Sequence, residues 1–401
     1  MTMASTCAAM GCALLATMAT APAASGTELG DPLPGLTDEE LADFFEGQEE
    51  FEEEETTESG IGPVFNDISC AACHGPIIGG SNGRIEFRFG RTVLGSFDPL
   101  ASLGGSLIQD HGIGSVADFF PDDPVCQAAS FAAETIPAAA NTRAGRRTTP
   151  LFGLGLVDAV PDQSFVNAAL YQAVFTPQTA GVLNRVTNPD TGTTVVGKFG
   201  WKAQVPTMHA FAGDAYLNEM GITNPAFPSE ICPQGNCAAL ACNPAPDLND
   251  DGEDVDAFAT FMTFLAPPPP PPANAITAAG QILFNTTGCG NCHTQTMTTG
   301  PNQVAALNQV QFAPYSDFLL HDMGSLGDGI VQGRATARLM RTAPLWGLHA
   351  SIPTGLLHDG RAHTVQEAIL AHEGQGALSR GKFQALSATN KAILLAFLAS
   401  L

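Results

Sequence analysis

Two short stretches decide how this chain is organised: Cys70-Ala71-Ala72-Cys73-His74 and Cys289-Gly290-Asn291-Cys292-His293. Each has the pattern C-x-x-C-H, which is the attachment signature of a c-type haem. Two thiols at this spacing bond to the two vinyl groups of one porphyrin, and the adjacent histidine then supplies the proximal iron ligand. The sequence therefore predicts two covalently bound haems, with His74 and His293 as iron ligands.

Two other interpretations of a paired-cysteine motif fit the sequence less well. A structural zinc site usually needs a second pair of ligands at short range, and neither stretch has a nearby Cys or His partner. A thioredoxin-like redox motif does not require the trailing histidine and would not be expected twice. Haem attachment explains every cysteine and histidine of both stretches.

The composition restricts the class of protein and of partner. The chain has 401 residues, enough for two or three domains with their own cores, and 44% of them are hydrophobic. It carries 40 acidic and 16 basic residues, a formal charge of -24. Such an excess of negative charge argues against nucleic acid or an anionic membrane as a partner, and it suits a soluble protein that meets a basic or locally positive partner.

The first residues predict export. Residues 1–26 contain a short apolar run and the A-x-A-like sequence Ala21-Pro22-Ala23, as a signal peptide does, although no Lys or Arg precedes the run. No other stretch reaches the eighteen or so apolar residues of a membrane span. A cleaved leader and covalent haem together indicate a periplasmic or extracytoplasmic protein.

Four cysteines remain outside the presumed leader and the two haem motifs. These are Cys126, Cys232, Cys237 and Cys242. In an oxidising compartment we expect them to form disulfides that fix the loop 231–243. Four cysteines allow three connectivities, and the sequence does not choose among them.

Several segments have recognisable local structure. We expect an acidic helix over residues 36–58, with Thr37 and Glu40 as its capping box, and further helices at 162–175, 206–220 and 390–401. Residues 75–146 have weak signals and are expected to form loops that wrap the first haem. Their one histidine, His111, is a haem ligand, a pocket residue or a surface residue.

A short internal sequence repeat, called the echo below, divides the chain into related parts. Residues 147–154 (Arg-Thr-Thr-Pro-Leu-Phe-Gly-Leu) match residues 341–348 (Arg-Thr-Ala-Pro-Leu-Trp-Gly-Leu), and each copy follows its own haem motif. Repetition of this kind indicates duplication of one haem-binding unit. The unbroken prolines 267–272 should form an extended, semi-rigid linker. We therefore expect haem domains at 27–266 and 273–401.

One acidic turn is a weak candidate for calcium. Asp247, Asn249, Asp251 and Gly252 resemble the first half of a calcium-binding loop. Phe258 stands where the loop requires an acidic ligand at its twelfth position. A solvated acidic turn is the better interpretation, and calcium is kept as the alternative.

Longer stretches carry a family resemblance. The chain resembles the bacterial di-haem oxidoreductases called thiol oxidoreductase-like, which are related to the di-haem cytochrome c peroxidases. The resemblance covers most of the chain after the leader. The stretches that carry it are 62–66, 150–161, 199–203, 219–223, 315–324 and 341–373. It implies a mainly α protein made of two cytochrome c-like haem domains with long loops, joined by the proline-rich linker.

The resemblance also assigns residues around the second haem. The sequence Leu357-His358-Asp359-Gly360-Arg361 matches the peroxidases' His-Asp-Gly loop, which implies that His358 and Arg361 contact the haem. Fourteen residues after His358, where those enzymes usually have a methionine ligand, this chain has His372. A bis-histidine iron has a lower potential than a His/Met iron. His321 and Met323 are rivals of His372 for this position.

Around the first haem the resemblance implies a catalytic group. Trp201 lies on a diverged copy of the loop that places a tryptophan between the haems, with Lys202 as one of the departures. His209 stands where the relatives have a glutamine, and Glu219 matches their catalytic glutamate. Trp201 as an ordinary core residue and Glu219 as a solvated one remain alternatives.

The expected activity follows from these matches. Hydrogen peroxide would bind at the N-terminal haem, and Glu219 would carry a proton from its near oxygen to its far oxygen. Electrons would come from a small redox protein through the C-terminal haem, with Trp201 aiding their transfer. Two alternatives stay open: a di-haem electron-transfer cytochrome without a substrate, and oxidation of an organic or protein substrate by a high-valent haem.

Overall fold

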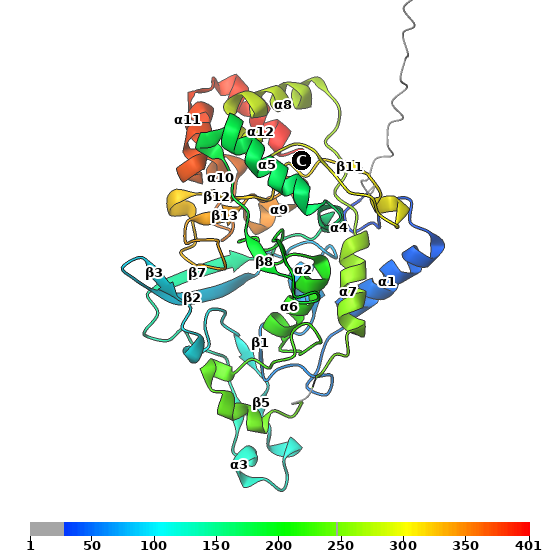
Figure 1. Cartoon of the computed structure of the whole chain (residues 1–401), viewed down its shortest axis with the longest axis vertical. Coiled ribbons are helices and arrows are strands. Elements are labelled where there is room, and N and C mark those ends of the chain that lie inside the picture. Colours follow the sequence, from blue (N-terminus) through cyan, green and yellow to red (C-terminus); the bar gives the residue numbers. More distant parts are fainter. Residues whose placement is uncertain (1–27, 246–247) are drawn as a thin grey trace, which may run out of the picture.

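The computed structural model describes residues 28–245 and 248–401 (Figure 1), so the expected leader lies outside the described residues. The fold is mixed but rich in helix. The helices are α1 (Asp38–Glu52), α2 (Cys70–His74), α3 (Pro124–Gln127), α4 (Leu154–Asp158), α5 (Asp162–Phe175), α6 (Met208–Met220), α7 (Glu253–Phe264), α8 (Ala275–Thr287), α9 (Leu348–Ser351), α10 (Val365–Ala371), α11 (Ala377–Ala385) and α12 (Ala388–Leu398). The strands are β1 (Val64–Phe65), β2 (Ile85–Val93), β3 (Ser96–Asp98), β4 (His111–Gly112), β5 (Gly114–Ser115), β6 (Ser130–Phe131), β7 (Thr142–Arg147), β8 (Arg185–Thr187), β9 (Thr194–Val196), β10 (Met297–Thr298), β11 (Gln311–Phe312), β12 (Leu320–Asp322) and β13 (Leu339–Arg341).

The expected helices are all present, and α5 has the predicted ends whereas the others are shifted at one or both ends. The Thr37 side chain accepts the N–H of Glu40, and the Glu40 carboxylate accepts the N–H of Thr37, so the predicted capping box starts α1. This helix ends at Glu52 rather than at 58. The predictions of α5, α6 and α12 are confirmed to within two residues at their starts.

The larger hydrophobic core lies between helices of the first half of the chain. α1 packs along α7, and α7 packs on α6 (Figure 1). The rings of Phe44 and Phe261 lie 5.2 Å apart where α1 meets α7, and Phe51 reaches from α1 to within 5.9 Å of the His74 ring. The same core therefore supports the first haem motif.

A three-stranded antiparallel sheet was not expected from the sequence. β2 pairs with β3 through a tight hairpin and with β7 over six residue pairs, from Ile85↔Arg147 to Gly90↔Thr142. Residues 75–146 are thus more ordered than loops that merely wrap a haem. The sheet matters for the site because it carries Glu86 and Arg88 toward the first motif.

The second core is built from the end of the chain. α8 packs against α12 and α11, and Phe284, Tyr315 and Phe397 stack edge to face around it. These helices form the upper part of Figure 1, above the sheet. The larger core also includes residues 306–319, which lie in the predicted second domain, so the two cores do not coincide with the two expected haem domains, and both that division and a cytochrome c-like fold stay predictions.

The two copies of the echo adopt the same local conformation and lie close together. Each runs from the end of a strand through a left-handed glycine, Gly153 (φ +70°) or Gly347 (φ +66°), into a short helix. A Cβ on Gly153 would lie 2.7 Å from Pro267 and 2.9 Å from Trp346. The first prolines of the 267–272 run are therefore packed between the two echoes, while the linker role of the run stays a prediction.

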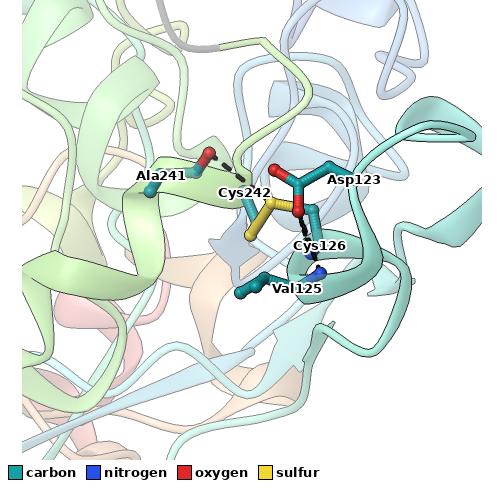
Figure 2. The surroundings of a disulfide bond; sticks show 5 residues. All are labelled: Asp123, Val125, Cys126, Ala241 and Cys242. Carbon is teal, nitrogen blue, oxygen red and sulfur yellow. Dashed lines mark hydrogen bonds between the residues drawn. A yellow bond between two sulfur atoms is a disulfide. The ribbon is translucent and has the colours of Figure 1, made fainter.

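The four remaining cysteines form two disulfides, as expected. Cys126 pairs with Cys242, and Cys232 pairs with Cys237. Figure 2 shows the first of them beside Asp123, whose carboxylate accepts the N–H of Val125 at the start of α3. The long-range bridge ties the α3 region to the segment that precedes α7, at the lower end of Figure 1.

None of the helices within residues 28–245 and 248–401 is long and apolar enough to cross a membrane.

The packing of the echoes gives a testable expectation for stability. Gly153→Ala should lower the free energy of unfolding by about 1–3 kcal/mol more than Gly95→Ala does, because both changes strain a positive φ but only the first adds overpacking. Gly95 has φ +82° and nothing within 4 Å of an added Cβ. Urea unfolding of the two haem-loaded variants measures the difference. Equal losses would mean that the contact among Gly153, Pro267 and Trp346 does not resist an added methyl group.

Candidate haem sites

Two cavities each contain one complete C-x-x-C-H motif. Cys70, Cys73 and His74 line the first, which we call pocket 1. Cys289, Cys292 and His293 line the second, pocket 2. All four of these cysteines are free thiols, unlike the cysteines of the disulfides. Among the described residues, the unpaired cysteines therefore lie at two places. Each place also has a histidine and a cavity.

The first motif forms a single helical turn at the wall of pocket 1. The Ser69 hydroxyl accepts the N–H of Ala72 and so starts α2, which ends at His74. His74 Nδ1 lies 3.1 Å from the Gly80 carbonyl oxygen, and the ring also interacts with the backbone of Thr149, so the protein backbone fixes its orientation. Burial lowers the pKa of His74 to about 4, so the ring is neutral at pH 7, as a ligand must be.

The second motif starts differently but presents the same groups. Gly288, in the left-handed conformation, ends α8 and leads into the turn Cys289–Asn291. His293 Nδ1 lies 2.9 Å from the Tyr315 carbonyl oxygen. Burial, with a smaller effect of His372, lowers the pKa of His293 to about 4. Both motif histidines are therefore neutral, oriented by a backbone carbonyl and directed into a cavity.

Pocket 1 contains a pair of interacting carboxyl groups. Glu219 from α6 and Glu86 from β2 hydrogen-bond to each other, and Asn66 Nδ2 donates to Glu219 Oε2 at 2.6 Å. Burial and then the charge of Glu86 raise the pKa of Glu219 to about 8. Burial also acts to raise the pKa of Glu86, but the Arg88 guanidinium, 2.9 Å away, outweighs it and lowers that pKa below its usual range. Glu219 is therefore the group of the pair that holds a proton at pH 7.

The structure places two of the expected residues outside pocket 1. His111, on β4, stacks on Phe65 and is half-exposed beside Asp110, away from the cavity lining. His209 directs Nδ1 to Asp190 (3.0 Å) and Nε2 to Asp256 (3.2 Å), so neither nitrogen is directed into the pocket. Among the described residues that line pocket 1, His74 is the one histidine. The two methionines in this lining belong to the hydrophobic core.

Pocket 2 is richer in histidine. His293, His321, His358 and His372 all line it, as does Met323. His372 Nδ1 lies 2.7 Å from the Ala368 carbonyl oxygen, which leaves Nε2 for a metal. His321 has its Nε2 3.0 Å from Asp317 Oδ2 and its Nδ1 3.5 Å from Cys292 Sγ. Of these two histidines, His372 has an Nε2 without a hydrogen-bond partner among the described residues, whereas both nitrogens of its rival His321 already have partners.

Trp201 lines both pockets. Its Nε1 donates to the Arg147 carbonyl oxygen at 2.9 Å, and its ring lies edge-on to His358, with centroids 6.2 Å apart. Arg147 also lines both cavities. Arg361 does not reach either cavity and instead pairs with Asp359 on the surface. The expected position of Trp201 between the two sites thus agrees with the geometry, and the expected contact of Arg361 does not appear.

The calcium expectation has no support in the geometry. Asp247 lies outside the described residues. The Asn249 side-chain oxygen accepts the N–H and hydroxyl of Thr223, and Asp251 accepts the N–H of Glu253. The side-chain oxygens of Asn249 and Asp251 named here thus already accept bonds from neighbouring donors of the protein.

The comparison with protein families agrees with this pair of sites. Residues 138–401 match the family described as "Di-haem oxidoreductase, putative peroxidase", and the chain belongs to that family. The match includes the second motif and begins after the first. Family membership implies haem as the cofactor.

The other comparisons add little. No curated protein matched the sequence. A solved structure of hydrazine synthase from Kuenenia stuttgartiensis, pressurized with xenon, aligns at 17% identity with 44% of this chain and 65% of that chain. Its TM-score is 0.27, which does not establish a shared fold.

The two cavities fit a haem on observations independent of the family. Each offers two free thiols and a neutral, oriented histidine. Arg147 Nε is buried without a hydrogen-bond partner among the described residues, at the junction of the two cavities. A buried guanidinium with an unused donor fits an anionic group such as a haem propionate.

Sequence reasoning missed Glu86 and Arg88, although a signal was present. Residues 85–89 alternate apolar and charged side chains, which is the period of a β-strand. The charged side chains of Glu86 and Arg88 are turned inward here, and on the opposite face Phe87 is exposed whereas Phe89 is fully buried. A polar strand face that turns inward indicates a polar cavity behind it.

The raised pKa of Glu219 predicts a pH dependence of stability. A carboxyl group with a pKa near 8 in the folded protein and 4.5 unfolded stabilises the fold at low pH, and this contribution is lost as the pH rises from about 4.5 to about 8. Glu219→Gln should remove that part of the decline. Denaturant unfolding across this range, with the exposed Glu58→Gln as control, measures it. A decline of the same steepness in Glu219→Gln and wild type would contradict the assignment.

Proposed function

We propose that the protein is a periplasmic di-haem peroxidase, which reduces hydrogen peroxide in pocket 1 with electrons received through pocket 2. The difference between the two pockets carries this proposal. Pocket 1 combines one histidine with an acidic pair, whereas pocket 2 combines several histidines, and Trp201 lies against both. The reaction takes up two electrons and two protons for each peroxide and releases two water molecules.

The haems would be held by the residues that line the cavities. Cys70 with Cys73, and Cys289 with Cys292, would form thioether bonds, and His74 and His293 would be the proximal ligands through Nε2. Arg147 would pair with a propionate. When bound, the haems supply iron centres that accept and donate single electrons.

The side chains of pocket 1 would handle the protons. In its ionised form, which a pKa near 8 leaves to a minority of the molecules at pH 7, Glu219 would take the proton from the near oxygen of peroxide and return it to the oxygen that leaves. A pKa near 8 suits both directions of transfer, because the group gains and loses a proton close to neutral pH. Glu86, kept ionised by Arg88, raises that pKa, and Asn66 fixes the orientation of the carboxyl group.

Pocket 2 would be the electron-storing site. His372 would hold the iron of a haem in this pocket together with His293, and that haem would accept and donate single electrons. The bonds of His321 to Asp317 and Cys292 favour His372 over this rival. Trp201 would shorten the path for electrons because its indole reaches both cavities.

Location and electron donor follow from redox chemistry and charge. Two disulfides are typical of an oxidising compartment, which supports the periplasm. A protein with a formal charge of -24 attracts a donor with a positive surface. We therefore propose a small, locally basic redox protein as the donor.

The ligand assignment in pocket 2 can be tested by single substitutions. His372→Ala should convert one low-spin haem signal to high spin, because it removes one of the two histidines that would hold the iron in pocket 2. Electron paramagnetic resonance and optical spectra of the oxidised protein measure this. His363→Ala, on an exposed histidine outside the pocket, is the control. An unchanged spectrum in His372→Ala, with a changed one in His321→Ala, would assign the ligand to His321.

The catalytic assignment is tested in half-reduced protein whose two haems are shown by mass to be covalently retained. Glu219→Gln keeps the shape of the side chain but cannot carry the proton, so its reaction with peroxide should be slower by about 10²–10⁴-fold. Stopped-flow absorbance measures the rate. The control is Glu230→Gln, because burial also raises the pKa of Glu230 to about 8, but this residue does not line pocket 1.

Two results would contradict this proposal. Equal rates in wild type and Glu219→Gln would dismiss Glu219 as the proton carrier. A wild-type protein with two six-coordinate irons and no reaction with peroxide would instead be an electron-transfer cytochrome.

A further inference from the structure

A tight turn between the pockets carries two neighbouring residues, one whose side chain lines the cavities and one whose side chain is buried in the protein. The N–H of Ala203 donates to the Gly200 carbonyl oxygen at 3.1 Å, so Trp201 and Lys202 are the two central residues of a β-turn. The Trp201 ring reaches both cavities, whereas the Lys202 side chain is fully buried. An unmodified lysine is seldom completely buried unless its charge is matched.

The Lys202 ammonium group occupies a cage of oxygen atoms. Its Nζ lies 2.7 Å from Asp328 Oδ1, 2.7 Å from the Leu339 carbonyl oxygen and 3.0 Å from that of Thr336. The Ala337 carbonyl oxygen completes the cage at 3.5 Å. An ammonium group has three N–H donors, and the three short contacts use all of them. One carboxylate and several carbonyl oxygens are also the ligands that a free cation takes in proteins.

The cage joins the two halves of the chain. Lys202 belongs to the first half, and every oxygen of its cage comes from residues 328–339 of the second. Asp328 also accepts two bonds from Arg146, at 2.9 Å and 2.7 Å, through its other oxygen. Next to the cage, Arg341 donates its N–H to the Trp201 carbonyl oxygen and its Nε to that of Gly200.

We propose that Lys202 is a tethered cation that holds the 200–203 turn against the second half of the chain, and thereby fixes Trp201 between the two pockets. The cage should then accept a free cation of the ammonium class once the side chain is shortened. This inference rests on the proposed electron path through Trp201. Lys202 is a positioning residue, because it acts through its neighbour rather than on a haem or on peroxide.

Lys198 provides a matched control within the same segment. It is also buried, and its Nζ lies 3.0 Å from the Asp158 carbonyl oxygen and 3.3 Å from Asp158 Oδ1. All of these partners belong to the first half of the chain. Removing Lys198 therefore removes a buried, paired lysine without opening the contact between the halves.

The experiment follows one electron between the haems of the full-length, haem-loaded protein, without peroxide. A photochemical reductant injects the electron, and absorbance records its redistribution. Lys202→Ala should slow redistribution by at least about tenfold, since small displacements of positioned groups have effects of this order. Methylammonium at tens of millimolar should restore most of the lost rate and raise the unfolding temperature of this variant. Tetramethylammonium, which is too large and has no N–H donor, should do neither.

Further variants separate positioning from general destabilisation. Lys202→Arg keeps a cation and should retain much of the rate, whereas Lys202→Met fills the space without a charge and should stay slow with or without methylammonium. Lys198→Ala should redistribute the electron at the wild-type rate. If Lys202→Ala does not accumulate as folded protein, the comparison of the arginine and methionine variants decides.

Two outcomes would overturn the inference. Wild-type redistribution in Lys202→Ala or Lys202→Met with both haems bound would show that Lys202 does not position the path. A slow Lys202→Ala protein that methylammonium neither speeds nor stabilises would show that the cage is not a cation site. Because no peroxide is used, a failure of the proposed peroxidase activity would leave these measurements unaffected.

Discussion

One buried carboxylate holds two cations where the halves of this molecule meet. Asp328 binds Arg146 with one oxygen and Lys202 with the other, and the charged parts of all three side chains are almost completely removed from solvent. Taking such charges out of water is costly, and their attraction offsets the cost only when the geometry is good. A contact of this kind contributes mainly to the choice of one arrangement over others. Here it sets the position of β7 and of the Trp201 turn, and with them one wall of each pocket.

Around this contact the two pockets have become chemically different. Their motifs are equivalent, and both motif histidines are held by a backbone carbonyl. The difference comes from what faces them: a strand and a helix that bring carboxyl groups in pocket 1, and a helix end that brings His372 in pocket 2. In the function proposed above, these unlike surroundings would let one site take up a substrate while the other stores an electron.

The sequence predicted the features that depend on short-range patterns. The haem motifs, the Thr37–Glu40 capping box and α5 need only neighbouring residues to be recognised. β2 was missed because its partner β7 lies about fifty residues later, and because two charged side chains of the strand are turned inward. His209 was assigned from its position in the chain, but α6 directs its side chain to Asp190 and Asp256. From the sequence, Lys202 was recognised only as a departure from the family's loop, because the residues that surround its ammonium group lie more than a hundred positions away.

The pairing of β2 with β7 also determines where this chain can be divided. The family match starts at residue 138, between the two strands, yet Glu86 reaches pocket 1 only because β2 is hydrogen-bonded to β7. A fragment cut at that boundary would keep the Trp201 turn and Glu219 but lose Cys70, Cys73, His74 and a whole wall of the cavity. Its β7 would become an exposed edge, open to pairing with another chain. The boundary found by family similarity is therefore not a boundary of the folded unit.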